Sequence, residues 1–312
     1  MYIKTRGLRL SMIPPRRIVL SGGGIKVISL VGALKVLHGA GQLKKVREIC
    51  GVSAGAWLGF MVASGCPIAK IEGLVLDIDF SVIRNLTPEA LLGFPETFGL
   101  DDGTKLAKFL ESITRVVLKL DPEITFEGLA ALPGSLSFRC WATDLNTEAI
   151  REFSAIKTPT VKILDALRAS MCIPLYFIPI KDPMNQHVLI DGGIQGNLPL
   201  NHLTEDECQE SLSLGFSSGN LHEVVHVTDA PQDLMGFMNA ILNSLSKGKY
   251  DAILKQWDHT ILRVPVDDFP SWNFEADRKD RQMLLTKGIL AATEWVKNAN
   301  SGSKAPLRRH SF

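Results

Sequence analysis

The hydrophobic positions in the first part of the chain alternate between short apolar runs and helix-like periodicity. Residues 17–20 form an apolar run typical of a buried strand, and from residue 25 apolar side chains recur at helical spacing until the glycines at 39 and 41. A second run at 46–50 leads through a glycine-rich turn into another apolar helical segment. This rhythm of strand, turn and helix, repeated twice, predicts a parallel α/β sheet.

The rest of the chain continues the same architecture. We expect helices over 67–76, from Asp102 to about 118, after Thr125, from Thr158 to about 171, from Asp233, and over 276–296. We expect strands at 136–143, 149–153, 188–190, 211–215, 224–227 and 260–266, of which the first two pair with each other. The segment 80–100 is apolar but interrupted by prolines and glycines, so it is predicted to be irregular.

One domain over residues 17–297 accounts for these elements. Residues 1–16 form a basic arm without an acid, and residues 298–312 form a polar, basic tail that we expect to be disordered. We see no repeat and no linker to a second domain. The arm lacks the apolar segment of a secretory signal, and the uncharged stretch between Glu48 and Lys70 is typical of a buried strand, turn and helix. We therefore expect a cytoplasmic protein, and any contact with membranes would be peripheral. The basic ends would help on an anionic surface, but solvated, disordered ends are the favoured interpretation.

Charge and cysteine content exclude several classes of protein. The net charge is +1, whereas a dedicated nucleic-acid binder usually carries a strong basic excess, so no nucleic-acid partner is predicted. The five cysteines contain no CxxC pair, which argues against a zinc ribbon or a thioredoxin-like site. Buried free thiols in a reducing compartment are the simpler interpretation.

Ser53 lies in a Gly-x-Ser-x-Gly pattern between a predicted strand and a predicted helix. A serine on such a sharp turn projects its hydroxyl outward, and the small residues Gly51 and Gly55 leave room for the strained backbone. The helix that follows presents its positive end to developing negative charge. The same pattern also occurs by chance in structural turns, so it does not by itself decide the function.

Gly22, Gly23 and Gly24 end the first predicted strand, and Lys26 follows them. Backbone N–H groups of such a turn, together with the helix N-terminus behind it, can hold an oxyanion. Lys26 would add positive charge or anchor the loop. A phosphate-binding loop is the alternative, but neither GxxxxGK[ST] nor GxGxxG fits the spacing.

Asp191 ends the apolar run at 188–190 and is followed by Gly192 and Gly193. Its carboxylate is expected at a sheet edge, where ligand sites of α/β folds gather, and close to Ser53 it would act as general base. An aspartate in a glycine turn is also common for structural reasons alone. A histidine base stays open as the alternative, and the candidates are His187, His202, His222, His226 and His259.

Taken in this order, the glycine loop, Gly-x-Ser-x-Gly and Asp-Gly-Gly resemble the patatin-like phospholipase family. Three further segments match its motif blocks: Ala-Thr-Asp-Leu-Asn-Thr at 142–147, the stretch 168–177 with Arg-Ala-Ser and Ile-Pro, and 193–199 with Asn-Leu-Pro. The resemblance covers residues 17–296 and is densest over 18–199. It implies a three-layer α/β fold with a central, mostly parallel sheet flanked by helices.

The resemblance also implies a serine hydrolase with a catalytic dyad. Ser53 would attack an ester carbonyl, Asp191 would act first as base and then as proton donor, and the loop at 22–24 would hold the oxyanion. Neither a metal nor a cofactor is implied. The implied substrates are fatty-acyl esters of phospholipids or lysophospholipids in membranes or micelles, and an activating protein partner is a further expectation because several members of the family need one.

Other functions stay open at this point. The dyad would also suit a soluble carboxylesterase or thioesterase. A catalytically silent member that binds lipid or protein is another alternative, since the family usually has glycine after the basic residue of its oxyanion loop and this chain has Val27. A nucleotide-binding domain would leave Ser53 and Asp191 incidental. The apolar stretch 80–100 and the residues around Trp272 would either line an acyl channel and its entrance or pack into the core.

Overall fold

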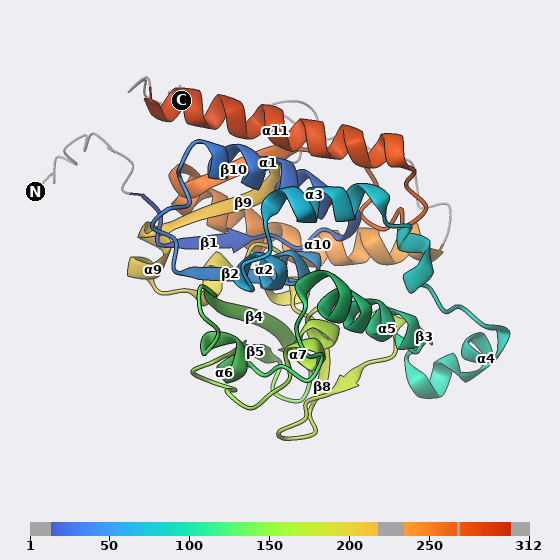
Figure 1. The fold of residues 1–312 in the computed structure, drawn as a ribbon. Helices are drawn as coiled ribbons and strands as arrows, with labels where there is room; N and C mark the ends of the chain where they lie inside the picture. The colour runs from blue at the N-terminus through green and yellow to red at the C-terminus, as the bar shows by residue number, and fades with distance from the viewer. Residues whose placement is uncertain (1–13, 218–233, 267–268, 301–312) are drawn as a thin grey trace, which may run out of the picture.

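The computed structural model describes residues 14–217, 234–266 and 269–300 (Figure 1). The strands are β1 (Arg17–Leu20), β2 (Glu48–Val52), β3 (Gly99–Asp101), β4 (Ser137–Asp144), β5 (Ala149–Ser154), β6 (Leu175–Phe177), β7 (Ile180–Lys181), β8 (Val188–Asp191), β9 (Ser211–Ser217) and β10 (Ile261–Pro265).

The α-helices are α1 (Val27–Gly39), α2 (Ala54–Ala63), α3 (Ile68–Asp77), α4 (Pro88–Thr97), α5 (Thr104–Ser112), α6 (Phe126–Ala130), α7 (Ile163–Ser170), α8 (Gly193–Gly196), α9 (Glu205–Gln209), α10 (Leu234–Trp257) and α11 (Arg278–Asn300). Shorter helical turns are the 3₁₀ segments η1 (Gly24–Lys26), η2 (Phe80–Ile83), η4 (Pro199–His202) and η5 (Asp258–Thr260), and the π-helical segment η3 (Ile113–Leu118).

The main sheet is mostly parallel. Strands β10, β9, β1, β2 and β4 lie side by side in that order and run parallel to one another, whereas β5, β7 and β8 are antiparallel to their neighbours. A separate pair, β3 and β6, is parallel. The predicted α/β class with a central, mostly parallel sheet is confirmed.

Alternation along the strands divides the interior into two cores. Ile18 and Leu20 face the larger core, which is filled by side chains of α1, α2, α7 and α11, while Val19 between them faces a smaller core formed with η4, α9 and α10. Successive strand residues point to opposite faces of a sheet, so each face packs against its own set of helices. Helices α1, α3 and α11 lie together on one side in Figure 1. The sheet is therefore the middle of three layers, as predicted.

Strands β2 and β8 meet head-on along one edge of β4. Strand β5 pairs with β4 from Arg139 to Asp144 and so occupies the other edge. The last residue of β2, Val52, is paired with Trp141, and the last residue of β8, Asp191, is paired with the next residue of β4. Since β2 runs parallel and β8 antiparallel to β4, their carboxyl ends converge at this point, and this convergence creates the site described below.

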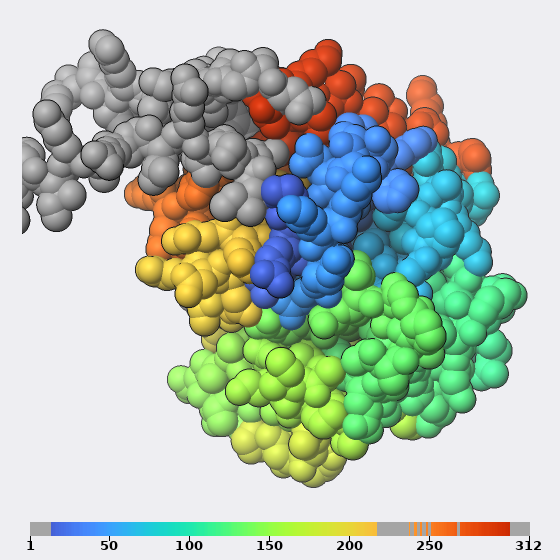
Figure 2. Space-filling view, turned by 60° about the vertical axis from the view of Figure 1, so that its left-hand side comes forward, coloured from blue at the N-terminus to red at the C-terminus, as the bar shows by residue number. Residues whose placement is uncertain are grey.

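An ion-pair network closes the opposite, amino-terminal end of the sheet. Glu48 binds Arg17 of the neighbouring strand β1 and lies 2.8 Å from the guanidinium of Arg139 on β4, which also contacts Glu207 of α9 at 2.8 Å. Figure 2 shows this end, where the dark-blue start of the described chain lies against the yellow segment that contains α9. These charged groups pair with one another at the end of the sheet opposite Ser53.

Several predicted elements need correction. The helix expected from Thr158 begins at Ile163, because Thr158 bonds back to Ser154 in a turn. The segment 80–100 is not irregular: it contains η2, α4 and β3. Strands β3, β6 and β7 were not predicted. The strand expected at 224–227, the basic arm up to residue 13 and the tail from residue 301 lie outside the described residues.

Within the described residues, no helix is both long enough and apolar enough to cross a membrane.

Candidate active site

Ser53 occupies the sharp turn between β2 and α2. Its backbone has φ 52° and ψ −132°, a conformation that residues with a side chain rarely adopt. The turn is held by two bonds: the Ser53 N–H donates to the hydroxyl oxygen of Ser170 at 2.9 Å, and the Ser53 carbonyl accepts from Ala56 N–H at 2.9 Å. A strained residue persists only where its surroundings hold it, and here the strain presents the hydroxyl at the N-terminus of α2.

Asp191 lies directly opposite Ser53. The Ser53 hydroxyl donates to Asp191 Oδ2 at 2.7 Å, and the other carboxylate oxygen, Oδ1, accepts from Gly193 N–H at 2.7 Å. Only 6% of the Asp191 surface is exposed. Burial raises the pKa of Asp191 to about 6, although both hydrogen bonds act in the opposite direction. A carboxylate that takes up a proton near neutral pH is suited to general base catalysis.

The glycine loop lies beside this pair. A methyl group on Gly22 would come within 3.0 Å of Ser53 Cβ. The Gly22 N–H is already used, because it donates to the Asn197 carbonyl at 2.9 Å. Among the described residues no acceptor is found for the N–H groups of Gly23 and Gly24, both of which are partly exposed. Gly22 therefore anchors the loop to the segment after Asp191 through its N–H group.

Gly24 sits where no other residue fits. Its φ is +55°, and a methyl group there would lie 2.0 Å from the carbonyl oxygen of Ser271. That carbonyl accepts the N–H of Ile25 at 2.9 Å, so the loop is tied to the segment after β10. Val27, in contrast, has ordinary helical angles, φ −54° and ψ −24°. A β-branched residue is not strained there, and the departure from the family pattern leaves the loop geometry intact.

The other predicted site residues lie where elements pack closely or where a helix begins. A methyl group on Gly51 would lie 2.4 Å from the Gly55 carbonyl oxygen, and one on Gly55 would lie 2.5 Å from the Ser21 carbonyl oxygen. Their lack of side chains therefore lets α2 approach the ends of β1 and β2. A methyl group on Gly192 would likewise lie 2.4 Å from the Trp141 carbonyl oxygen. The Lys26 carbonyl accepts the Ser29 hydroxyl at 2.8 Å, a bond within the first turn of α1.

Three polar residues hold these parts together through hydrogen bonds to their backbone atoms. The side-chain NH₂ group of Asn197 donates to the Gly22 carbonyl at 2.9 Å. The backbone carbonyl of Asn197 accepts from the Gly22 N–H and from the Ser21 hydroxyl. Ser170 supports Ser53, and the Thr143 hydroxyl donates to the Asp191 carbonyl at 2.9 Å. Sequence reasoning found these residues inside motif blocks but gave them no role. The available signal was a small polar residue at a fixed place in an apolar run.

Comparison with known proteins identifies the family of this chain. The chain matches the patatin-like phospholipase family over residues 18–204, which is more than half of its length. The chain belongs to the patatin-like phospholipase family. An uncharacterized protein of Acanthamoeba polyphaga mimivirus is 24% identical over 286 residues, which are 90% of this chain and 93% of that protein.

Two further matches concern the patatin-like region and the fold. A probable lipid hydrolase of Invertebrate iridescent virus 6 is 28% identical over 187 residues, which are 59% of this chain and 62% of that protein. The crystal structure of VipD from Legionella pneumophila matches with a TM-score of 0.60 at 17% identity, over 92% of this chain and 67% of that one. The second match shows likeness of fold.

No histidine of the described patatin-like domain is hydrogen-bonded to Ser53. The Nδ1 atom of His187 lies 2.8 Å from Asp144 Oδ2, and the rings of His202 and His259 lie near tryptophans. His222 and His226 lie outside the described residues. The geometry therefore favours Asp191 over a histidine as the partner of Ser53.

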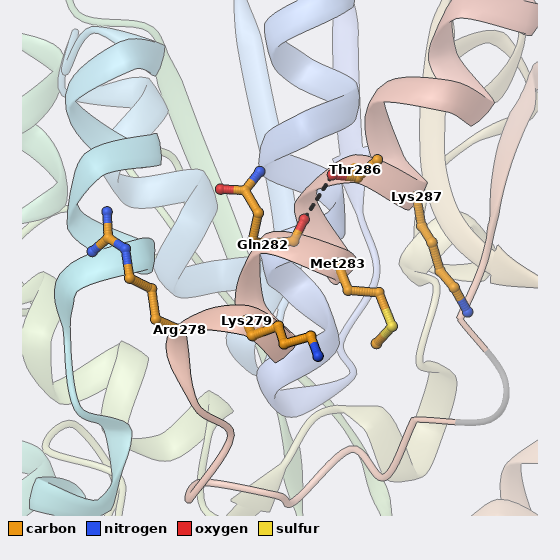
Figure 3. A pocket seen from close by; sticks show the side chains of 6 residues that line it. All are labelled: Arg278, Lys279, Gln282, Met283, Thr286 and Lys287. Atoms are coloured by element: carbon orange, nitrogen blue, oxygen red, sulfur yellow. Dashed lines mark hydrogen bonds between the residues drawn. The ribbon is translucent and has the colours of Figure 1, made fainter.

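Three further features of the described residues concern a surface hollow, the cysteines and the side chains that could hold a metal. An open hollow of about 660 Å³ is lined by residues of α11, among them Arg278, Met283 and Lys287, and Figure 3 shows these side chains spread along one helix. The five cysteines are free, and burial raises the pKa of the thiol nearest the site, Cys172, to about 12. Within the described residues no group of three or more metal-ligating side chains is found.

Proposed function

We propose that the protein is a lipid acyl hydrolase that cleaves fatty-acyl esters of phospholipids or lysophospholipids, with Ser53 as nucleophile and Asp191 as base. The observation that carries the proposal is the 2.7 Å hydrogen bond from the Ser53 hydroxyl to a buried carboxylate. Membership of the patatin-like phospholipase family and the name of the viral lipid hydrolase support the lipid substrate.

Acylation uses both residues of the dyad. Ser53 Oγ attacks the ester carbonyl carbon while its proton moves to Asp191 Oδ2, and the carbonyl oxygen becomes an oxyanion. In this proposal the N–H groups of Gly23 and Gly24, for which no acceptor is found among the described residues, bind that oxyanion. Collapse of the tetrahedral intermediate breaks the ester C–O bond, and the proton on Asp191 passes to the departing alcohol oxygen.

Deacylation reverses these roles. Water attacks the Ser53 ester while Asp191 takes one of its protons, and the collapse of the second intermediate returns that proton to Ser53 Oγ. The products are a free fatty acid and the regenerated dyad. One carboxyl group with a pKa of about 6 serves as base and acid in turn, so the scheme needs no histidine.

The alternatives make different predictions. A silent, lipid- or protein-binding member was suggested by Val27 alone, and the helical angles of that residue remove the reason. A soluble esterase or thioesterase would use the same dyad but prefer short, dispersed substrates to vesicles. An activating protein partner remains a prediction, tested by adding cell extract to the purified chain.

The test is labelling with a fluorophosphonate followed by peptide mapping, together with product analysis on phosphatidylcholine vesicles, lysophospholipid micelles, a short-chain ester and a thioester. We expect one adduct, on Ser53, and release of fatty acid from the lipid substrates. Heat-unfolded protein is the control for labelling that does not need the site. An adduct on a different serine, or neither adduct nor hydrolysis with and without extract, would contradict the proposal.

Gly24→Ala is predicted to disable the oxyanion loop. The added methyl group would lie 2.0 Å from the Ser271 carbonyl oxygen in a residue with φ +55°, so the loop must shift and its donors move. Loss of such donors typically lowers kcat by about 10²- to 10³-fold. Steady-state hydrolysis of a short-chain ester measures the effect. Gly39→Ala, where nothing lies within 4 Å of the new methyl group, is the matched control and should leave kcat unchanged.

A further inference from the structure

Helix α4 is the part of the fold whose apolar side chains are least explained by packing. None of its ten residues is buried. Leu92 is 84% exposed, Leu91 64%, and Phe98 just after the helix 62%. In Figure 1, α4 lies at the margin of the molecule, outside the three layers. Isolated exposed leucines are ordinary, but several on one short projecting helix mark a contact surface.

The apolar residues of α4 form one stripe. At about 100° per residue, Pro88, Leu91, Leu92 and Pro95 fall on the same face of the helix, and all four are exposed. Glu89 and Glu96 fall together on the flank of that stripe and are exposed as well. A surface helix of a globular protein normally turns its apolar stripe inward, whereas α4 turns it to solvent.

The base of this projection is fastened. The Asn85 N–H donates to the buried carboxylate of Asp101, and the Asn85 side chain donates to Asp102 at 3.1 Å. The same Asp101 carboxylate accepts from Gly103 N–H at 2.8 Å. Residues on both sides of α4 are thereby joined, so residues 86–98 project as a closed finger. We call residues 86–98 the α4 finger.

The α4 finger connects directly to the candidate active site. The finger leads into strand β3, which pairs with β6, so that Gly99 lies beside Leu175 and Asp101 beside Phe177. Strand β6 begins three residues after Cys172, whose carbonyl accepts the N–H of Asp191 at 2.7 Å. The base of the finger is therefore joined, through β3 and β6, to the segment that positions the proposed base.

We propose that the α4 finger docks the protein on a zwitterionic, choline-bearing lipid surface by inserting Leu91, Leu92 and Phe98. This proposal rests on the proposed function for its choice of a lipid partner. Charge complementarity selects the kind of lipid: the finger carries no lysine or arginine, and its only charges, Glu89 and Glu96, suit the outward-facing trimethylammonium groups of phosphatidylcholine.

The size of the exposed area does not by itself choose between a lipid surface and a second copy. The large side chains of the finger expose on the order of 500 Å², and a specific protein–protein interface buries about 800 Å² on each partner, of which a little over half is apolar. Shallow insertion into a lipid surface requires no matching partner surface and gains from each apolar group that leaves water.

The test is co-sedimentation with phosphatidylcholine vesicles of the chain carrying Ser53→Ala, so that binding is read without hydrolysis. The double substitution Leu91→Ser/Leu92→Ser is expected to weaken partitioning at least about tenfold. Leu290→Ser on α11 is the matched control, because Leu290 is also 64% exposed. This control should bind as the parent does, and circular dichroism checks that each variant is folded.

The outcomes separate this inference from the proposed function. In the chain with Ser53 intact, Leu91→Ser/Leu92→Ser should slow vesicle hydrolysis at least about tenfold and leave short-chain ester hydrolysis unchanged. Hydrolysis of esters with equal vesicle binding by parent and variant would overturn the docking inference alone. Leucine-dependent binding without any hydrolysis would keep docking and reject the proposed function. A binding defect that appears only with phosphatidylserine, or a dimer in gel filtration that the variant abolishes, would also overturn it.

Discussion

Ser53→Ala is expected to lower kcat for ester hydrolysis by at least about 10⁴-fold, because the attacking oxygen is removed and water must react with the substrate directly. The fold should survive. Alanine has the same steric demand at φ 52°, and the two backbone bonds that hold the turn, to Ser170 and Ala56, do not involve the hydroxyl. The measurement is fatty-acid release from phosphatidylcholine, with circular dichroism as the check on folding.

A second serine on α2 provides the control for Ser53→Ala. Ser64 caps the other end of the same helix, and its hydroxyl donates only to the Met61 carbonyl, so Ser64→Ala should keep full activity. The double variant Ser53→Ala/Asp191→Asn should be no slower than Ser53→Ala alone, since residues that act as a unit are not additive. Multiplicative losses, or Ser53→Ala activity within tenfold of wild type, would mean that Ser53 is not the nucleophile.

The chemistry of the site was predictable from local sequence because each part is a short motif at the end of a strand. Ser53 between strand and helix, and Asp191 before two glycines, are visible without any tertiary contact. That they meet is not visible in the sequence, because the two residues that form the 2.7 Å hydrogen bond are 138 positions apart. Only the antiparallel entry of β8 on the edge that β2 leaves free explains why they meet, and no periodicity encodes that register.

The elements that sequence reasoning missed depend on contacts from elsewhere in the chain. Helix α4 does carry an apolar stripe, but Gly93 and Pro95 interrupt its sequence and none of its residues is buried, so the pattern is typical of a loop. Strands β3 and β6 are three residues each and exist through their pairing. Thr158 and Pro159 are typical of a helix start, but the bonds from Thr158 to Ser154 hold a turn instead.

In the loop at 22–24, local sequence predicts the glycines, whereas a distant residue decides how one of their N–H groups is used. Three successive glycines predicted three donors, and the Asn197 carbonyl occupies the first of them. Asn197 lies 175 positions away, in the segment after Asp191. Its bonds to Gly22 join the proposed oxyanion loop to the segment that follows the proposed base, Asp191. A sequence motif contains such a residue but does not show which N–H group its carbonyl accepts.

Asp191→Asn is expected to lower kcat/KM by about 10³- to 10⁴-fold at pH 8 without disturbing the geometry. The asparagine oxygen can accept from Gly193 N–H while its NH₂ group donates to Ser53 Oγ, so both existing contacts are satisfied. That arrangement reverses the hydrogen bond at the nucleophile and leaves no group to take the Ser53 proton. Fluorophosphonate labelling at Ser53 should slow in parallel, and unchanged labelling would reject Asp191 as the base.

The pH profile tests the same assignment independently. Only the ionised carboxylate can act as base, so kcat/KM of the wild type should rise with unit slope below a pH of about 6 and reach a plateau above it. Asp191→Asn should retain a small activity that lacks this limb. A wild-type limb that persists in Asp191→Asn would assign it to another group, with His187 beside Asp144 the first to replace.

Stability should change in the opposite sense to activity. The pKa of Asp191 is higher in the folded than in the unfolded chain, so the folded state holds an extra proton between about pH 4 and 6 and loses stability as pH rises through that window. Above pH 6 the buried charge costs up to about 3 kcal/mol, which Asp191→Asn removes. Thermal unfolding should therefore show a higher Tm for Asp191→Asn than for wild type at pH 8 and equal values near pH 3. A lower Tm at pH 8 would mean that Asp191 serves the fold rather than the reaction.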